Sequence, residues 1–386
     1  MVSNGSPPES AAARKAPALS TDANQASTQE KLYVLRTPAE PLADFCTAAM
    51  VEAGLSEADA RLTADVLIRT DMRGIYTHGT VSLRRYVWMM RDGGIDVGAS
   101  PEITDQGLAW ARIDARRTVG MVASHYGMSV AIDKAAACGI GMTTVRRSNH
   151  FGAASAYTLM ALERNMIGIA MSNTDVVMNI PGGRGAAIGN NPFSYAVPAR
   201  SQPPIVLDIA MSTVAGGKVA SYQARGEPLP EGWLTDAEGL PTTDPGVFTF
   251  TGALTPFSGH KGYGLALFVE SLAGVLAGAG VTTDIVSWGK VTDATCDEGH
   301  NFIAVDAGAM MPVDAFYDRV DELVRRMREA PKAAGADRTY VPGEMEHDSE
   351  AVSRREGVPL TRMAAENLKG LAEDTGLLDR LPFEQS

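Results

Sequence analysis

Residues 141–171 read GMTTVRRSNHFGAASAYTLMALERNMIGIAM, and this stretch decides the expected fold. It begins with the β-prone residues 141–145, passes through the polar turn 148–150 (SNH), and ends with the apolar run 166–171. Between the turn and the last run, the sequence up to Asn165 has the composition of a helix. Strand, helix and strand in this order predict an α/β unit.

The same alternation continues on both sides of this stretch. Strands are expected at 108–113, 193–197 and 204–210, and helices at 118–138 and 261–279. Together these elements predict an α/β cofactor-binding domain at residues 113–300.

Helical patterns occupy both ends of the chain. A capping box at Thr37–Glu40 and a cap at Ser56 start the first two helices. Further helices are expected at 80–92, 312–330 and 346–371. The domain expectation is therefore a disordered leader at 1–32, a helical part at 33–112, and a C-terminal part at 301–386 that packs back on the N-terminal helices.

The bulk composition is that of a globular protein with an acidic surface. Apolar residues make up 45% and the net charge is -12, so the general field repels nucleic acid and anionic membranes. The longest apolar run, 265–281, carries Glu270 and is too short to span a bilayer. Three cysteines give no disulfide framework, and Cys46 and Cys138 lie in apolar helical patterns that predict burial. These features favour a cytoplasmic protein without nucleic-acid or membrane partners.

Several familiar motifs are missing from the sequence. No G-x-G-x-x-G follows a strand, so nothing indicates an ordinary Rossmann dinucleotide site. The phosphate loop G-x-x-x-x-G-K-[ST] and the zinc motif His-Glu-x-x-His are also absent, and the six histidines do not cluster at ligand spacing. No G-x-S-x-G elbow is present, which argues against a serine hydrolase. No metal is therefore expected.

Two histidines lie in glycine-containing turns. His78 is in the segment 73–79 (RGIYTHG), where the flanking glycines would let the backbone approach a ligand. An imidazole with an ordinary pKa of about 6.5 can donate a proton at neutral pH. His150 is in 148–152 (SNHFG), after a strand, where ligands gather in open α/β sheets. Either histidine alone could instead be structural, as a loop hydrogen-bonder or part of an N-cap cluster.

Other polar groups stand at the ends of predicted elements. Asp208 ends a buried strand and could orient a histidine, bind a ribose hydroxyl or cap a helix. The segment 258–264 (SGHKGYG) opens a long helix, and a helix N-terminus with a lysine favours phosphate. The glycines of 182–192 could form an anion-binding nest or an ordinary hairpin, and 342–344 (PGE) forms a turn.

In this order, the six segments resemble the malate/L-lactate dehydrogenase family that lacks the usual Rossmann fold. The resemblance covers roughly residues 35–375, and the family includes ureidoglycolate, sulfolactate, 2,3-diketo-gulonate and Δ1-piperideine-2-carboxylate reductases. It implies an α/β fold with a mixed-sheet NAD(P)-binding domain and a helical domain built from N- and C-terminal segments. It also implies a homodimer and catalysis without a metal.

The resemblance implies roles for several of these segments. His78 would be the proton donor and acceptor, with Thr77, Asp208 and His150 as the other catalytic residues. NAD or NADP would be held by Val206, Leu207, Asp208, Ile209, Ala210, His260, Lys261, Pro342, Gly343 and Glu344. The small-molecule substrate would contact Ser82, Tyr86, Asn149 and His150.

Position 82 departs from the family. The family usually has an arginine four residues after the histidine, which pairs with the substrate carboxylate, and this chain has Ser82. Losing a bidentate arginine–carboxylate contact should weaken 2-oxo acid binding by about 10- to 100-fold. Arg84 or Arg85 could substitute, or the substrate lacks that carboxylate.

The leading prediction is hydride transfer between NAD(P)H and a small 2-oxo acid, 2-hydroxy acid or related carbonyl. A reductase of cyclic imino acids is the rival within the same class of enzyme. An NAD(P)-binding protein without turnover, or a non-redox enzyme on the same scaffold, is the rival from another class.

Overall fold

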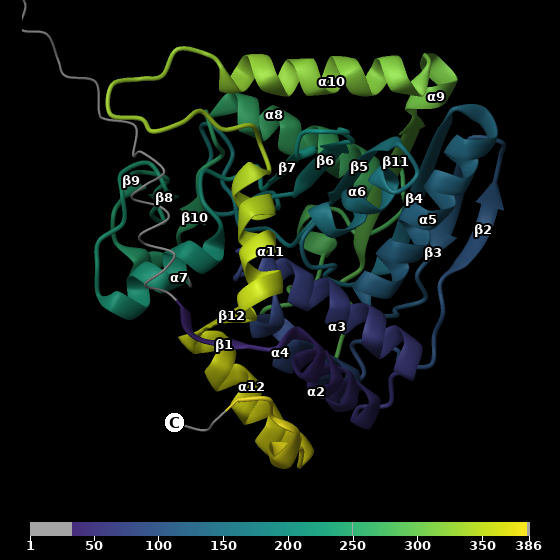
Figure 1. The fold of residues 1–386 in the computed structure, drawn as a ribbon. Helices are drawn as coiled ribbons and strands as arrows, with labels where there is room; N and C mark the ends of the chain where they lie inside the picture. Colours follow the sequence, from purple (N-terminus) through teal and green to yellow (C-terminus); the bar gives the residue numbers. More distant parts are fainter. Residues whose placement is uncertain (1–32, 249, 384–386) are drawn as a thin grey trace, which may run out of the picture.

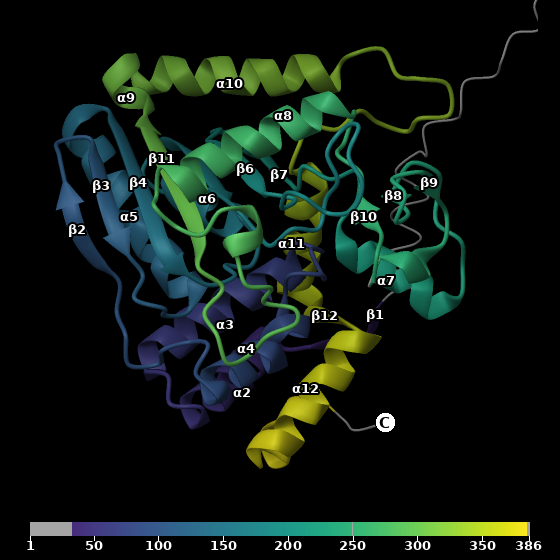
Figure 2. The ribbon, with the colours of Figure 1, turned by 180° about the vertical axis from the view of Figure 1, so that it is seen from behind.

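The computed structural model describes residues 33–248 and 250–383, and a mixed sheet of seven strands lies at its centre (Figures 1 and 2). Only β3 and β4 pair in parallel, and all other neighbours in this sheet are antiparallel. The α/β class with a mixed sheet is therefore confirmed. In spatial order the strands are β2 (Glu102–Gln106), β3 (Trp110–Asp114), β4 (Ile140–Ser148), β11 (Glu298–Asp306), β5 (Met166–Ser172), β6 (Phe193–Val197) and β7 (Ile205–Ile209).

The central strand, β11, was not expected from the sequence. It comes late in the chain and pairs antiparallel with β4 on one side and β5 on the other. The predicted limits of the α/β part, at 112/113 and 300/301, fall inside β3 and β11. The sheet therefore extends beyond those limits, from β2 to the end of β11.

Helices cover both faces of the sheet. Helices α5 (Gly120–Cys138) and α6 (Ser155–Leu162) lie on one face, and α8 (His260–Val269), which continues as the π-helical segment η3 (Glu270–Val275), lies on the other. The contact between α5 and β4 is very close, because a Cβ on Gly141 would lie 1.9 Å from the Ala131 carbonyl oxygen. Phe302 of β11 is fully buried in the core under α5 and α6.

Segments from the two ends of the chain form the helical part (Figure 1). Val358, Leu360, Leu368 and Leu371 join one core with the N-terminal helices. The N-terminal elements are β1 (Tyr33–Thr37), α2 (Ala39–Glu52), α3 (Glu57–Met72) and α4 (Leu83–Asp92); the C-terminal ones are α11 (Glu344–Glu356), β12 (Val358–Thr361), which pairs with β1, and α12 (Arg362–Thr375).

The remaining elements extend the α/β part. A small three-stranded sheet packs near α7 (Gly216–Arg225), and α10 (Val313–Arg328) crosses the outside of the molecule after the short α9 (Ala307–Met310). The small sheet consists of β10 (Ala253–Leu254), β8 (Leu234–Thr235) and β9 (Pro241–Thr242). Within the ranges described, no helix combines the length and apolarity needed to cross a bilayer.

Three local predictions were wrong. The helix expected at 346–371 is broken by Gly357, whose φ is +96°, and by Pro359 in β12. Thr37 belongs to β1 and caps no helix, since its hydroxyl donates to the Pro382 carbonyl and α2 has no side-chain cap. Cys138 is exposed, because the last turn of α5 turns it away from the core, whereas Cys46 is buried. The leader expected at 1–32 lies outside the described residues.

Candidate active site

The loop that carries His78 is folded around a buried carboxyl group. Asp71, in the last turn of α3, accepts hydrogen bonds at Oδ2 from the Thr80 backbone N–H (2.9 Å) and hydroxyl (2.6 Å). A Cβ on Gly79 would lie 1.9 Å from Asp71 Oδ1, so this glycine makes room for Asp71 and not for a ligand. Burial raises the pKa of Asp71 to about 7, while the two bonds from Thr80 act in the opposite direction.

Within this loop, the His78 ring is held on one side. Thr77 Oγ1 lies 2.8 Å from His78 Nδ1, and Nε2 has no hydrogen-bond partner among residues 33–248 and 250–383. The first turn of α7 packs on the same threonine, since a Cβ on Gly217 would lie 2.8 Å from Thr77 Cγ2. Burial lowers the pKa of His78, and the nearby charge of Asp208 works to raise it.

His150, just beyond β4, lies beside His78 in a stack of aromatic rings. The two imidazole centroids are 5.7 Å apart, and the Trp288 ring covers His150 at 4.1 Å with an interplanar angle of 14°. The Tyr86 hydroxyl from α4 lies 2.5 Å from His150 Nδ1. Burial, followed by the charges of His78 and His300, holds the pKa of His150 well below its usual value. His150 is therefore a neutral ring at physiological pH.

Trp288 is a site residue that the sequence did not reveal. It lies in the irregular stretch between residues 284 and 298, where no periodicity or motif singled it out. Arg85 fixes this stretch by donating to the carbonyls of Trp288 (2.7 Å) and Val291 (3.0 Å). The aromatic wall over His150 is thus anchored to α4.

Arg84 and Arg85, the two possible substitutes for the family's arginine at position 82, both have other partners. Arg85 is engaged by backbone carbonyls, and Arg84 forms an ion pair of 2.8 Å with Asp374 on α12. Ser82 itself is buried in the short 3-10 turn that precedes α4. Neither neighbouring arginine therefore takes over the position that the family gives to its carboxylate-binding residue.

Asn149 is fully engaged by the protein. Its Nδ2 donates to the carbonyls of Arg117 and Thr118, and its Oδ1 accepts from the Thr295 hydroxyl and the Cys296 N–H. With these four bonds made, the amide has little capacity left for a ligand. The Asn149 side chain therefore positions the loop next to His150.

His300 of β11 fixes the strand ends beneath the site. Its Nδ1 lies 2.8 Å from Ser172 Oγ on β5, and its Nε2 lies 2.8 Å from Ser148 Oγ on β4. The Phe151 ring stacks on it at 4.7 Å. Burial lowers the pKa of His300 to about 3, so it stays neutral while it joins three strands.

Asp208 binds the start of a helix, although this is α6, which precedes it in the chain, and not the next helix as considered from the sequence. At the end of β7 its Oδ2 accepts a hydrogen bond of 2.7 Å from the Ser155 N–H, so it caps the first turn of α6. Its charge also acts on His78. The same carboxylate therefore binds the first turn of α6 and raises the pKa of His78.

The three segments predicted to hold the cofactor all adjoin β7. Val206 donates to the Pro342 carbonyl (2.9 Å), and a Cβ on Gly343 would lie 2.8 Å from the Val206 carbonyl oxygen. At the other end of the strand, Phe257 donates to the Met211 carbonyl just before α8. His260 and Lys261 are exposed at the start of α8. The structure thus brings 206–210, 260–261 and 342–344 together along one strand.

One residue predicted to hold the cofactor, Glu344, already has protein partners for its carboxylate. Glu344 is buried, and its carboxylate is paired with Arg328 and accepts from the Val341 N–H. Its side chain therefore stabilises the turn before α11.

Across the described ranges, no group of three His, Cys, Asp or Glu side chains is arranged to hold a metal ion.

A model of the malate/L-lactate dehydrogenase family matches residues 37–369. The chain belongs to this family. A malate dehydrogenase from Pyrococcus horikoshii is 33% identical over 363 residues, which cover 90% of this chain and 99% of the relative. The solved structure of the malate dehydrogenase from that organism has a TM-score of 0.82 at 30% identity and covers 89% of this chain and 96% of its own.

The family membership identifies the protein as an oxidoreductase of the malate/L-lactate dehydrogenase type. Its relatives also include an enzyme that reduces imines. The Δ1-pyrroline-2-carboxylate/Δ1-piperideine-2-carboxylate reductase of Pseudomonas putida is 31% identical over 338 residues, which cover 88% of this chain and 97% of the relative.

The buried His300 makes the stability of this dehydrogenase depend on pH. Its folded pKa of about 3 lies below the unfolded value of 6.5, so the folded state loses stability as the pH falls from 6.5 towards 3. Between pH 7 and 4.5, the free energy of unfolding should fall by about 2–3 kcal/mol more in the wild type than in His300→Gln. Urea unfolding at one protein concentration measures this difference. Equal losses of unfolding free energy in the two proteins would contradict the lowered pKa of His300.

Proposed function

We propose that this protein transfers a hydride between NAD(P)H and a small 2-oxo acid or related carbonyl. His78 donates the proton during reduction and accepts it during oxidation of the hydroxy acid. The observation that carries this proposal is the position of His78, with Nδ1 next to Thr77 and Nε2 left for substrate, beside the neutral ring of His150. Its charge partner, Asp208, ends the strand along which the proposed cofactor segments meet.

The residues along β7 fit a dinucleotide. The first turn of α8 is exposed with Lys261, and a Cβ on Gly259 would meet nothing within 4 Å, so this turn is open to a phosphate. NAD(P)H would supply the hydride when bound there. The backbone of 206–210 and 342–344 would hold its remaining parts, and both NAD and NADP are compatible with this proposal.

The proton chemistry follows from the pKa of His78. Because burial lowers that pKa, the free enzyme holds His78 mainly as a neutral base at pH 7. A neutral imidazole can take the proton of a hydroxy acid as hydride leaves its carbon. In the reverse direction only the protonated fraction is active, so reduction is favoured at lower pH.

The substrate pocket is proposed to include Ser82, Tyr86 and His150. Ser82 leaves this pocket without the family's usual carboxylate-binding arginine, and Arg84 and Arg85 do not replace it. Reduction of a cyclic imino acid is the second candidate, and its support is the similarity to the Pseudomonas putida reductase. In either reaction His78 would protonate the atom next to the carbon that receives the hydride.

The His78→Gln variant tests the proton-transfer role. Removing the ring nitrogen proposed to exchange the proton with the substrate should lower kcat by about 100- to 10,000-fold, with cofactor affinity unchanged. NAD(P)H absorbance with pyruvate, oxaloacetate and piperideine-2-carboxylate measures turnover, and fluorescence titration measures binding. His125→Gln, on the exposed side of α5, is the matched control and should keep full activity. A His78→Gln enzyme with full turnover would refute the role.

The same substrates separate the candidate functions. Oxidation of the cofactor with the oxo acids supports the first proposal, and oxidation with the imine alone supports the second. Cofactor binding without oxidation of any of these would favour a binding protein or a non-redox enzyme. We also place the protein in the cytoplasm, since its three cysteines are all free thiols.

We further propose that two copies form a dimer through one face of α8 and η3. This face carries a stripe of exposed apolar side chains at helical spacing: Leu265, Phe268, Val275 and Leu276 are 45%, 49%, 64% and 54% exposed. Exposed apolar side chains that recur along one helix are typical of a surface covered by a partner. The dimeric assembly implied by the family resemblance points to a second copy of the chain.

Charge on this stripe should prevent the assembly. The double variant Phe268→Lys, Val275→Lys should elute as a monomer, while the wild type has the mass of a dimer in size-exclusion chromatography with light scattering. Leu108→Lys is the control, because Leu108 is 76% exposed but lies in the turn between β2 and β3. A double variant that remains a dimer would show that the interface lies elsewhere.

A further inference from the structure

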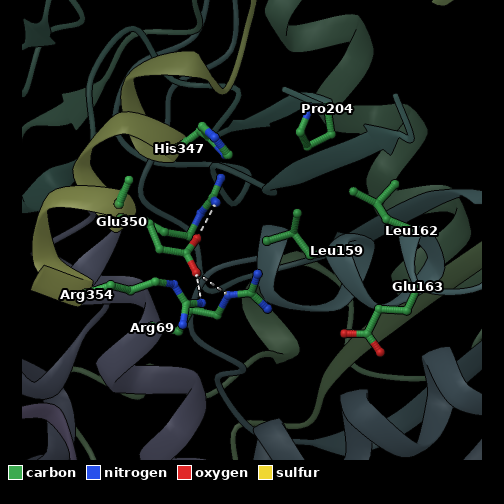
Figure 3. A pocket seen from close by; sticks show the side chains of 10 residues that line it. Arg69, Leu159, Leu162, Glu163, Pro204, His347, Glu350 and Arg354 are labelled. Carbon is green, nitrogen blue, oxygen red and sulfur yellow. Dashed lines mark hydrogen bonds and ion pairs between the residues drawn. The ribbon is translucent and has the colours of Figure 1, made fainter. Parts of the chain in front are cut away.

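A cavity of about 500 Å³ lies between α3, α6 and α11, outside the candidate active site (Figure 3). None of its lining residues belongs to the catalytic, substrate or cofactor sets described above. Its charged wall consists of Arg69 in α3, Arg73 just after α3, Glu350 and Arg354 in α11, and Glu163 just after α6. His347 stands at the rim on the α11 side.

Three guanidinium groups converge on one carboxylate in this wall. Glu350 Oε1 accepts from Arg69 Nε (3.2 Å) and from Arg354 (2.6 Å), and Oε2 accepts from Arg73 (3.0 Å). These contacts hold the pKa of Glu350 below its usual value in spite of its burial. The cavity lining thus holds three guanidinium groups against two carboxylates, those of Glu350 and Glu163.

The positive charge of this cluster exceeds what Glu350 can satisfy. The Arg73 side chain is only 6% exposed, and its Nε has no hydrogen-bond partner in the structure. Buried polar groups are otherwise almost always paired, so this enclosed Nε leaves part of the Arg73 charge uncompensated just behind the cavity wall. Arg69 and Arg354 are part-exposed and each gives Glu350 only one of its N–H-bearing nitrogens.

We propose that this cavity binds a phosphate monoester. Guanidinium forks match phosphate oxygens in bidentate geometry, and the part-exposed Arg69 and Arg354, with the buried charge of Arg73 behind them, suit a dianion. The opposite wall is apolar, with Leu159, Leu162 and Pro204 available to the organic part of the ligand. Glu163 lines the cavity on that side and could accept a hydrogen bond from a hydroxyl or amino group of the ligand.

The position of the cavity allows two sources of this phosphate. Pro204 directly precedes β7, and the His347 N–H donates to the Gly343 carbonyl (3.0 Å), so the cavity flanks two of the proposed cofactor segments. One source is the 2′-phosphate of NADP, and this source rests on the proposed function. The other is a free phosphate ester that binds independently of the cofactor.

Calorimetric titration of the full-length protein tests the proposal. NADP+, NAD+ and glycerol phosphate are titrated into the wild type, Arg69→Gln and Arg354→Gln. Both variants keep the buried pair of Arg73 and Glu350, so the fold is retained, as a thermal melt would verify. Loss of one guanidinium should weaken binding of the phosphate ester by about 10- to 100-fold. Arg355→Gln, on α11 but outside the cavity, is the control and should have no effect.

The pattern of affinities distinguishes the two sources. A loss for NADP+ alone, with NAD+ affinity unchanged, supports the cofactor phosphate; a loss for glycerol phosphate, in the presence of saturating NAD+, supports a free ester. The proposal is overturned if no phosphate ester loses affinity in either cavity variant. Ester binding that is sensitive to these variants, in a protein without hydride transfer, would contradict the proposed function and leave this site intact.

Discussion

The hydrogen bond between Tyr86 Oη and His150 Nδ1 is the contact on which the site depends. It joins α4, from the helical part, to the loop that follows β4 in the central sheet. Trp288 stacks on His150 and lies beside the Tyr86 ring, and Arg85, next to Tyr86, holds the Trp288 carbonyl. A single turn of α4 therefore fixes both the second histidine and the wall above it.

This junction needs the two ends of the chain to come together. Helix α4 is held against α12 through the Arg84–Asp374 ion pair and a shared apolar core. On the other side, β11 enters the sheet between β4 and β5, and His300 ties the ends of these strands with two serine hydroxyls. Because His150 follows β4 by two residues, its position depends on a strand that lies 150 residues later in the sequence.

The sequence predicted much of this arrangement, and the failures have physical causes. Short segments with fixed local chemistry, such as 73–79 and 258–264, identified the family and the candidate residues. Strand β11 escaped detection because Glu298, His300 and Asn301 interrupt its apolar pattern, although His300 is satisfied by partners distant in sequence. Gly79 was interpreted as room for a ligand, whereas the buried carboxyl of Asp71 occupies that room. Trp288 has no local signal, since only the folded chain places it on His150.

The central claim is that His78 transfers the proton and that the charge of Asp208 raises the pKa of His78. The most direct measurement is the pH dependence of kcat/KM for reduction in the wild type and in Asp208→Asn, which keeps an acceptor for the Ser155 N–H and removes the charge. Burial places the wild-type pKa of His78 below 6.5, so activity should fall as the pH rises through a midpoint below that value. Since the charge of Asp208 raises this pKa, the midpoint in Asp208→Asn should move to lower pH. A midpoint that stays in place or moves to higher pH would contradict the account.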